Sequence, residues 1–293
     1  MTGVLWAAVS GIGFGLFQSV NVRAVRQLED VYVSTFLQLL VAAVVLLFAC
    51  VVAGELPLLS GASAWAWISF ALAGAIHFFL GWTLLNASQD RIGAARTSPL
   101  ITTTPLFGVA IAAVTLGQLP GAAALGAIAV MVAGALVITE PRSEAGVRFQ
   151  DAVPGLTTSF LWALSPVFTV EGLDELDSPL LGVTIGMVFS VLAYALVLGA
   201  AGGKRRPALD LPRQGVALKL TAGVLVALSI WGRWLALDLA DVGVVLALSL
   251  LAVPTVLLLA PVIAGRHMER VDARIWLGAG LVVAGALALI AAD

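Results

Sequence analysis

His77 is the titratable residue that lies closest to the middle of a long apolar stretch, within GAIHFFLGW. The ordinary pKa of an imidazole is about 6.5, so a histidine at this depth can exchange a proton near neutral pH or contact a bound solute. A second interpretation is that His77 only joins two helices by a hydrogen bond. The sequence allows both, because a buried polar group costs free energy unless it faces a cavity or a partner.

Arg233 lies inside another apolar stretch, IWGRWLAL. It can extend its guanidinium group to a membrane surface between Trp231 and Trp234, which suit an aromatic belt. Alternatively it can pair with Asp238, or it can bind the carboxylate of a solute near an outer mouth. The sequence leaves these three roles open.

Uncharged polar side chains recur within the other apolar stretches. Amides and hydroxyls both donate and accept hydrogen bonds, so they suit the orientation of a neutral or zwitterionic solute, and a large indole supplies an apolar wall. Taken singly, such groups more often join neighbouring helices. As a set, we predict solute-binding residues at His77, Gln18, Gln38, Trp162, Thr102, Arg233 and Asn86.

Three prolines also fall inside apolar stretches, where a proline removes a backbone hydrogen bond and kinks a helix. Such a kink serves either as a moving gate or as a static bend that fits its neighbours. We predict gating positions at Pro105, Pro166 and Pro254.

The sequence offers little for catalysis or metal binding. Its two histidines are far apart, its one cysteine, Cys50, lies in an apolar run, and it has no Walker glycine loop and no GxSxG motif. All 17 acidic residues fall in loops or near the ends of apolar stretches. We therefore expect a protein that is not an enzyme and that uses no metal or cofactor.

The elements that position these residues have the composition of a membrane protein. Hydrophobic residues make up 61% of the 293 residues and charged residues 11%, against roughly 45–50% and about 25% in soluble domains. The mean hydropathy is +1.07. The net charge of −2 lacks the basic excess that nucleic-acid binding requires. We predict an all-α integral membrane protein.

Ten apolar runs are long enough to cross a bilayer, whose core of about 30 Å needs roughly 17–25 helical residues. Proline, glycine and charged residues separate them, as in GQLPG and GGKRRPALDLPRQ. We predict ten transmembrane helices near residues 3–22, 31–53, 64–86, 97–116, 121–139, 152–170, 179–201, 215–237, 242–264 and 273–291.

The basic residues favour one orientation of these helices. If the loops alternate sides, every Lys and Arg except Arg233 lies in or beside the loops that follow helices 1, 3, 5, 7 and 9, Lys219 among them. An excess of Lys and Arg marks cytoplasmic loops. We therefore expect a multi-pass protein of the cytoplasmic membrane with both termini outside.

One apolar phrase occurs twice, as VMVAGALVI at 130–138 and VVAGALALI at 282–290. The loops after helices 1 and 3 are basic, whereas the corresponding loops after helices 6 and 8, EGLDELD and LDLADV, have no basic residue. Because five is odd, a duplicated five-helix unit enters the membrane the opposite way the second time. We predict two inverted repeats, residues 1–145 and 146–293.

These features resemble the drug/metabolite transporter superfamily, in particular its ten-helix members built from two EamA-type repeats. Each half has a Trp-bearing first helix, LWAAVSGIG and LWALSPVFT, and a proline-containing fourth helix, SPLITTTPLFGVAIAAVTLG and LALSLLAVPTVLLLAPVIAG. A Gly-rich fifth helix closes each half. The family's Gly-Glu pair after the fourth helix is replaced by Gly117-Gln118, so no role is assigned there.

The resemblance implies a secondary transporter or exporter with a central cavity lined by the first four helices of each repeat. From the residues we predict small neutral or zwitterionic metabolites, such as amino acids, moved by alternating access. A passive channel and a membrane scaffold without transport are the alternatives. The expected partners are the small-molecule substrate and the lipid bilayer, with protons as a candidate coupling ion and no nucleic acid. Both a monomer and a homodimer fit the sequence.

Overall fold

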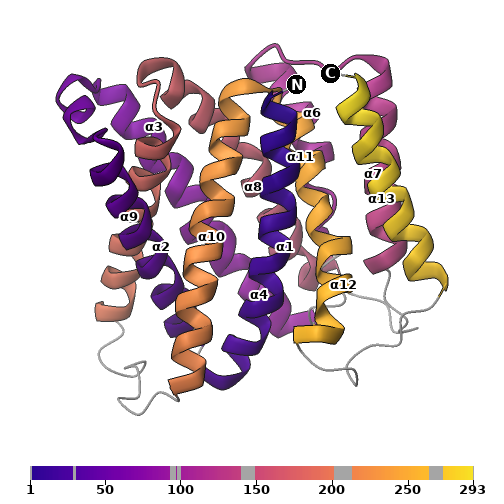
Figure 1. Cartoon of the computed structure of the whole chain (residues 1–293), viewed down its shortest axis with the longest axis horizontal. Coiled ribbons are helices and arrows are strands. Elements are labelled where there is room, and N and C mark those ends of the chain that lie inside the picture. The colour runs from indigo at the N-terminus through magenta and orange to yellow at the C-terminus, as the bar shows by residue number, and fades with distance from the viewer. Residues whose placement is uncertain are drawn as a thin grey trace.

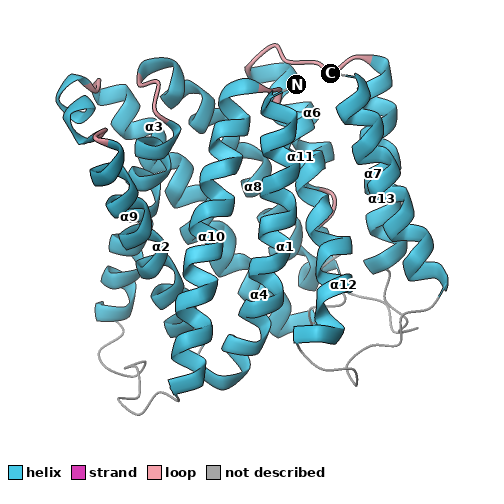
Figure 2. Cartoon of the chain, in the orientation of Figure 1, coloured by secondary structure: helices cyan, strands magenta, loops and turns pink. Residues whose placement is uncertain are grey.

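The computed structural model describes residues 2–28, 31–92, 97, 100–139, 149–200, 213–263 and 273–292. Within these residues every regular element is a helix, as Figures 1 and 2 show. Long apolar runs form helices because a helix satisfies its backbone hydrogen bonds internally, and the hydrocarbon core of a membrane offers no other partners for them.

In the first half of the chain, one π-helical stretch interrupts the third long helix, which consists of α3, η2 and α4. The elements of this half are α1 (Thr2–Leu28), α2 (Val31–Ala53), the short 3-10 helix η1 (Leu56–Gly61), α3 (Ala64–Gly74), the π-helical η2 (Ala75–Gly81), α4 (Trp82–Ile92), α6 (Thr104–Thr115) and α7 (Ala122–Thr139).

The second half contains a helix interrupted by a 3-10 turn. Its elements are α8 (Phe149–Glu175), α9 (Pro179–Ala200), α10 (Arg213–Leu239), α11 (Val242–Leu248), the 3-10 turn η3 (Ser249–Leu251), α12 (Ala252–Ile263) and α13 (Ala273–Ala292).

In the described part of the chain each predicted apolar run falls mainly on helical residues, with two differences in continuity; residues 98–99, 201 and 264 of these runs lie outside that part. The fourth run was expected as one helix from residue 97, and residues 97, 100 and 101 are helical, but a turn at residues 102–103 separates them from α6, which begins at Thr104. The ninth run was expected as one helix and is divided by η3. Among the described residues, six helical stretches are long and apolar enough to span a membrane, and four shorter apolar helices accompany them.

The helices stand side by side, and the two described ends of the chain lie at the same end of the bundle (Figure 1). We call this the terminal end and the opposite one the far end. α1 runs from the terminal end towards the far end beside α10, while α7 and α13 form a pair at one edge of the bundle.

Small residues allow the closest helix contacts. A Cβ atom added to Gly74 would lie 2.1 Å from the backbone oxygen of Gly186, so α3 and α9 touch through their backbones. A Cβ on Gly134 would meet the Gly278 oxygen at 2.7 Å, which shows the same contact between α7 and α13. Van der Waals packing of this kind drives helix association where no hydrophobic effect operates.

Hydrogen bonds between the two halves join them at the terminal end. Ser63, which caps α3, donates to Glu175 Oε2 at 2.7 Å, and Ser178, which caps α9, donates to Glu55 Oε2. The amide of Val242, at the start of α11, donates to the Gln118 side chain at 3.0 Å. We call the two Ser–Glu pairs the terminal clasp.

Candidate functional site

A cavity of about 540 Å³ lies between the two halves of the chain. This volume is in the usual range for small-molecule sites, about 300–1,000 Å³. All seven residues that the sequence predicts as solute-binding contribute to its wall: Gln18, Gln38, His77, Asn86, Thr102, Trp162 and Arg233.

The cavity is not centred in the bundle but extends towards the far end. Its lining residues on α1 run from Ser10 to Asn21, which corresponds to about 16 Å along the helix axis. Thr35 near the start of α2 and Asn86 near the end of α4 also line it, and both lie towards the far end. The terminal clasp lies at the opposite end.

Aromatic side chains form much of the apolar wall. Trp162 was predicted, but Phe14, Phe17 and Trp82 were not. Phe17 and Trp82 stack with ring centroids 6.4 Å apart and an interplanar angle of 9°. Because aromatic residues are common in ordinary membrane helices, their identity alone does not distinguish a cavity wall from helix packing.

His77 is positioned by the π-helical turn η2. A π turn leaves backbone groups without their usual partners and is often found at functional sites. Here the indole Nε1 of Trp162 donates to the backbone oxygen of His77 at 3.2 Å. The two rings stack, with centroids 5.4 Å apart and 18° between their planes. A contact between the halves therefore holds His77 at the cavity wall.

The imidazole itself bonds to α8. Its Nδ1 lies 2.9 Å from the Ser165 hydroxyl, and only 6% of the His77 surface is exposed. His77 thus combines the two predicted arrangements, since it joins two helices and also lines the cavity.

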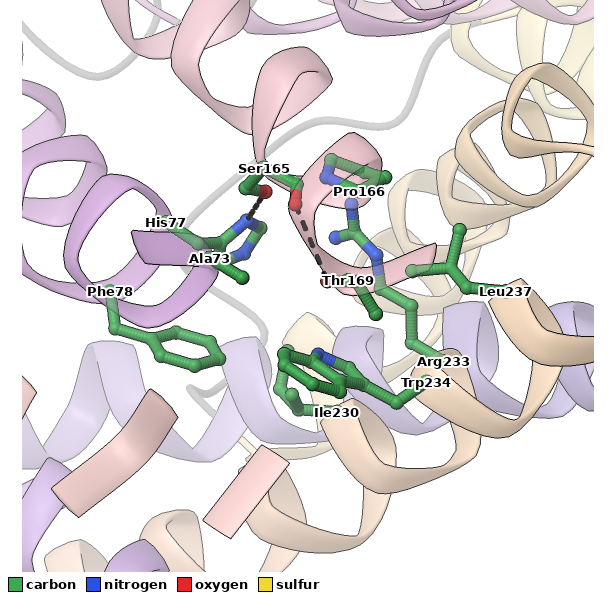
Figure 3. A pocket seen from close by; sticks show the side chains of 10 residues that line it. All are labelled: Ala73, His77, Phe78, Ser165, Pro166, Thr169, Ile230, Arg233, Trp234 and Leu237. Atoms are coloured by element: carbon green, nitrogen blue, oxygen red, sulfur yellow. Dashed lines mark hydrogen bonds between the residues drawn. The ribbon is translucent and has the colours of Figure 1, made fainter. Parts of the chain in front are cut away.

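Pro166 lies inside α8, as predicted, next to these residues. Proline has no amide hydrogen, so the backbone oxygen four residues earlier, on Trp162, loses its helical partner. The hydroxyl of Ser165 donates to that oxygen at 3.4 Å. Pro166 and its neighbours also line a second, much smaller cavity, which Figure 3 shows between His77 and Arg233. Its volume of about 10 Å³ is near the minimum for one water molecule.

Arg233 lines both cavities, and its guanidinium group lies against Pro166 and Thr169 (Figure 3). The Nη2 atom is buried and has no hydrogen-bond partner in the described part of the chain. Asp238, the pairing partner considered above, is exposed. The side chain therefore faces the protein interior rather than a membrane surface.

Asn86 and Gln38 belong to hydrogen-bonded groups around the cavity, and Gln18 and Thr102 line it as well. Asn86 donates to the Thr35 hydroxyl at 3.3 Å, which ties α4 to α2. Thr102 is 4% exposed and lies in the turn that precedes α6. Gln38 is 2% exposed.

The two remaining prolines occupy matching places in the two halves. Pro105 lies in the first turn of α6, where a proline costs no hydrogen bond, and not inside a continuous helix as expected. Pro254 lies in the first turn of α12, directly after η3. Thr102 before Pro105 and Ser249 before Pro254 both line the cavity. Each half thus interrupts its fourth helix at the cavity wall.

Lys219 was placed at a loop by the sequence, but the structure buries it. It is the seventh residue of α10 and only 3% of its surface is exposed. Its ammonium group donates to Gln38 Oε1 at 2.9 Å and also to Asn21 Oδ1. Both acceptors line the cavity. The sequence did indicate one thing about Lys219: it lies fourteen residues before Arg233, which is nearly four helical turns, so the two residues share one face of the helix.

Comparisons with known proteins support this architecture. A solved crystal structure, described only as that of a protein, superposes with a TM-score of 0.71. It is 17% identical in sequence, and the match covers 96% of this chain and 95% of that chain. At this identity the likeness shows the fold alone. No curated protein matches the chain at a significant level.

Residues 1–140 match the model of the EamA-like transporter family. This span contains α1 to α7 and six of the ten predicted solute-binding or gating residues, His77 among them. The match agrees with the resemblance found in the sequence: the first half of this chain is similar to the EamA-like transporter family, and the long apolar helices indicate a multi-pass membrane protein.

Proposed function

We propose that this protein is a secondary-active transporter, working as an exporter of small metabolites by alternating access. The observation that carries the proposal is the cavity of about 540 Å³ between the halves, which is lined by polar and aromatic residues and has the terminal clasp at one end. The family match supports the transporter class.

The proposal includes ten membrane-spanning helices in two inverted five-helix repeats. The helix contacts support this arrangement because exchanging the halves maps one contact onto another. α1 packs on α10 and α12, while its counterpart α8 packs on α3 and α6. α2 packs on α9, and α7 packs on α13, so these pairs map onto themselves. Interrupted helices at matching places of two repeats are typical of transporter binding sites.

In this proposal the structure corresponds to a state open towards the cytoplasm. The cavity extends to the far end, and the distribution of Lys and Arg assigns that end to the cytoplasm. The terminal clasp then closes the outer side. Alternating access requires the clasp to open and the far end to close in turn.

Among the predicted substrate classes, we favour zwitterions such as amino acids over uncharged solutes. A zwitterion brings a carboxylate that the guanidinium group of Arg233 can bind, which is a strong charge-assisted interaction. An uncharged solute leaves the buried Nη2 atom without a counter-charge. His77, which lines the same cavity, is the candidate group for proton coupling.

The test is transport by purified protein in proteoliposomes. A panel of radiolabelled amino acids is offered with and without a pH gradient, and protein-free vesicles serve as the control. Accumulation above the outside concentration under a gradient supports secondary-active transport. Equilibration without accumulation favours a passive facilitator, and no protein-dependent flux of any compound contradicts the proposal.

A further inference from the structure

We propose that the cavity selects its substrate by an anionic group, which Arg233 binds directly and for which Lys219 positions further hydrogen-bond donors. The inference rests on the proposed transport function and narrows its substrate class. It predicts that the carboxylate of a zwitterion is the recognised group and that its ammonium group is dispensable. Organic anions with an apolar body then bind at least as well as amino acids.

The charges at the cavity have one sign. Arg233 lines it, and the Lys219 ammonium lies directly behind two of its lining residues, Asn21 and Gln38. None of the described residues that line the cavity is acidic. A bound cation would therefore meet the basic groups of Arg233 and Lys219 with no carboxylate of the described lining to offset them, whereas a bound anion would be attracted by the positively charged groups.

The guanidinium group is placed to contact such an anion. Arg233 lines the large cavity and the small one beside His77, and its buried Nη2 atom has no partner in the described part of the chain. Buried polar groups in native proteins are nearly always paired. Because Nη2 is buried in this state, a substrate carboxylate first meets the part of Arg233 that lines the cavity, and a rotation of the guanidinium group would bring Nη2 to it.

Lys219 acts on the cavity wall through two amides. A lysine ammonium group can only donate hydrogen bonds, so its contacts identify the oxygen atoms of Asn21 and Gln38 as the acceptors. Each amide oxygen has two lone pairs and Lys219 occupies one of them, so each amide keeps two N–H donors and one acceptor position for other partners. Lys219 thus shifts the balance of the two cavity-lining amides towards donors, which suits an anion better than a cation.

The two basic residues also lie in line. Fourteen residues of an α-helix correspond to about 21 Å and nearly four full turns, so Lys219 and Arg233 share one face of α10. Arg233 lies in the last third of α10, towards the terminal end, and Lys219 lies near the start of α10, at the far end. An anion that moves through this half of the protein passes from one positive charge to the other.

Three probes with the same phenylpropyl skeleton test the charge preference: 3-phenylpropanoate, 3-phenylpropanamide and 3-phenylpropylamine. Calorimetry on the purified full-length protein in detergent gives their dissociation constants. We expect the anion to bind at least tenfold more tightly than the amide, and the amine to bind more weakly than either. Equal or tighter binding of the amide or the amine, or no binding of any probe to folded protein, overturns the proposal.

Variants then separate the two roles. Arg233→Gln should bring the anion and amide affinities to within about threefold of one another by removing the charge of Arg233. Lys219→Met should lower the ratio of the anion affinity to the amide affinity at least threefold. Lys219→Arg, which keeps the charge, should restore most of that ratio. Arg213→Gln is the matched control, because it removes a positive charge from an exposed position on the same helix. It should leave the ratio unchanged.

The ratio of the anion affinity to the amide affinity distinguishes a change in recognition from a change in stability, since a variant that only loosens the fold weakens the binding of both ligands alike. An unchanged ratio in Lys219→Met overturns the role of Lys219. If a variant fails to fold, the wild-type comparison still decides the charge preference. Anion-selective binding without flux in proteoliposomes contradicts the transport proposal alone, and flux without charge preference contradicts this inference alone.

Discussion

At the scale of single residues, position within an apolar helix was the informative property of the sequence. A polar side chain inside a membrane segment costs free energy unless it faces a cavity or a partner. The structure follows this rule for His77, Arg233 and Gln38, which all line the cavity. Their contact with a substrate stays a prediction.

The same rule missed Lys219, for a physical reason. It lies close to the start of α10, where a lysine usually extends to the membrane surface, so the sequence counted it with the loop. The spacing from Arg233 indicates a shared helix face, but the burial of Lys219 depends on the amides of α1 and α2, and those contacts join residues far apart in the chain.

The residue-scale prediction concerns His77→Gln. Glutamine keeps a hydrogen-bonding group that can reach the Ser165 hydroxyl but does not titrate in this range. If His77 carries the coupling proton, the variant should lose accumulation driven by a pH gradient in proteoliposomes and keep measurable substrate exchange. Undiminished pH-driven accumulation would show that His77 only joins α8 to the cavity wall.

At the scale of elements, the sequence located the helices but not their interruptions. Hydropathy reports length and composition, and these are the same for an α-helical and a π-helical run. Hydropathy therefore could not predict the π-helical turn Ala75–Gly81, although this turn positions the ring of His77 to stack on that of Trp162. Pro166 lies inside α8 as expected, whereas Pro105 lies in the first turn of α6 and not inside a kinked helix. A gating role of the prolines stays a prediction.

The element-scale prediction concerns the closest backbone contact, between α3 and α9. Gly74→Ala would place a methyl group 2.1 Å from the Gly186 oxygen. Overpacking of this kind costs about 1–3 kcal/mol, so the thermal midpoint in detergent should fall by several degrees. Gly126→Ala is the matched control, because nothing lies within 4 Å of that added methyl group. Alanine is also the better helix former, so the control should be neutral or stabilising. Equal midpoints for both variants would refute the contact.

At the scale of the whole molecule, the charge pattern predicts an orientation. Cysteines introduced for Ser60 or Gly121, both exposed at the terminal end, should react with a membrane-impermeant maleimide in intact cells. A cysteine for Ala208, in a predicted cytoplasmic loop outside the described residues, should react only after the cells are opened. The native Cys50 is fully buried and can be replaced by alanine to remove background. Labelling of the Ala208 variant alone would reverse the orientation.

The last prediction concerns the terminal clasp, because alternating access requires this end to separate. Ser63 Oγ and Glu175 Oε2 lie 2.7 Å apart and belong to different halves. In a protein with Cys50→Ala, cysteines at both positions can be joined by a short bifunctional thiosulfonate reagent. The joined protein should lose net flux in proteoliposomes, since the outer side cannot open, and a reducing agent should restore it. Binding in detergent should persist, because the cavity extends to the other end.

Each single-cysteine variant treated with the same reagent controls for modification of one position alone. Full flux through protein whose cross-link is verified on a gel would mean that the halves do not separate at the clasp. The substrate would then leave by another path, and separation of the halves at the clasp would not be a step of the transport cycle.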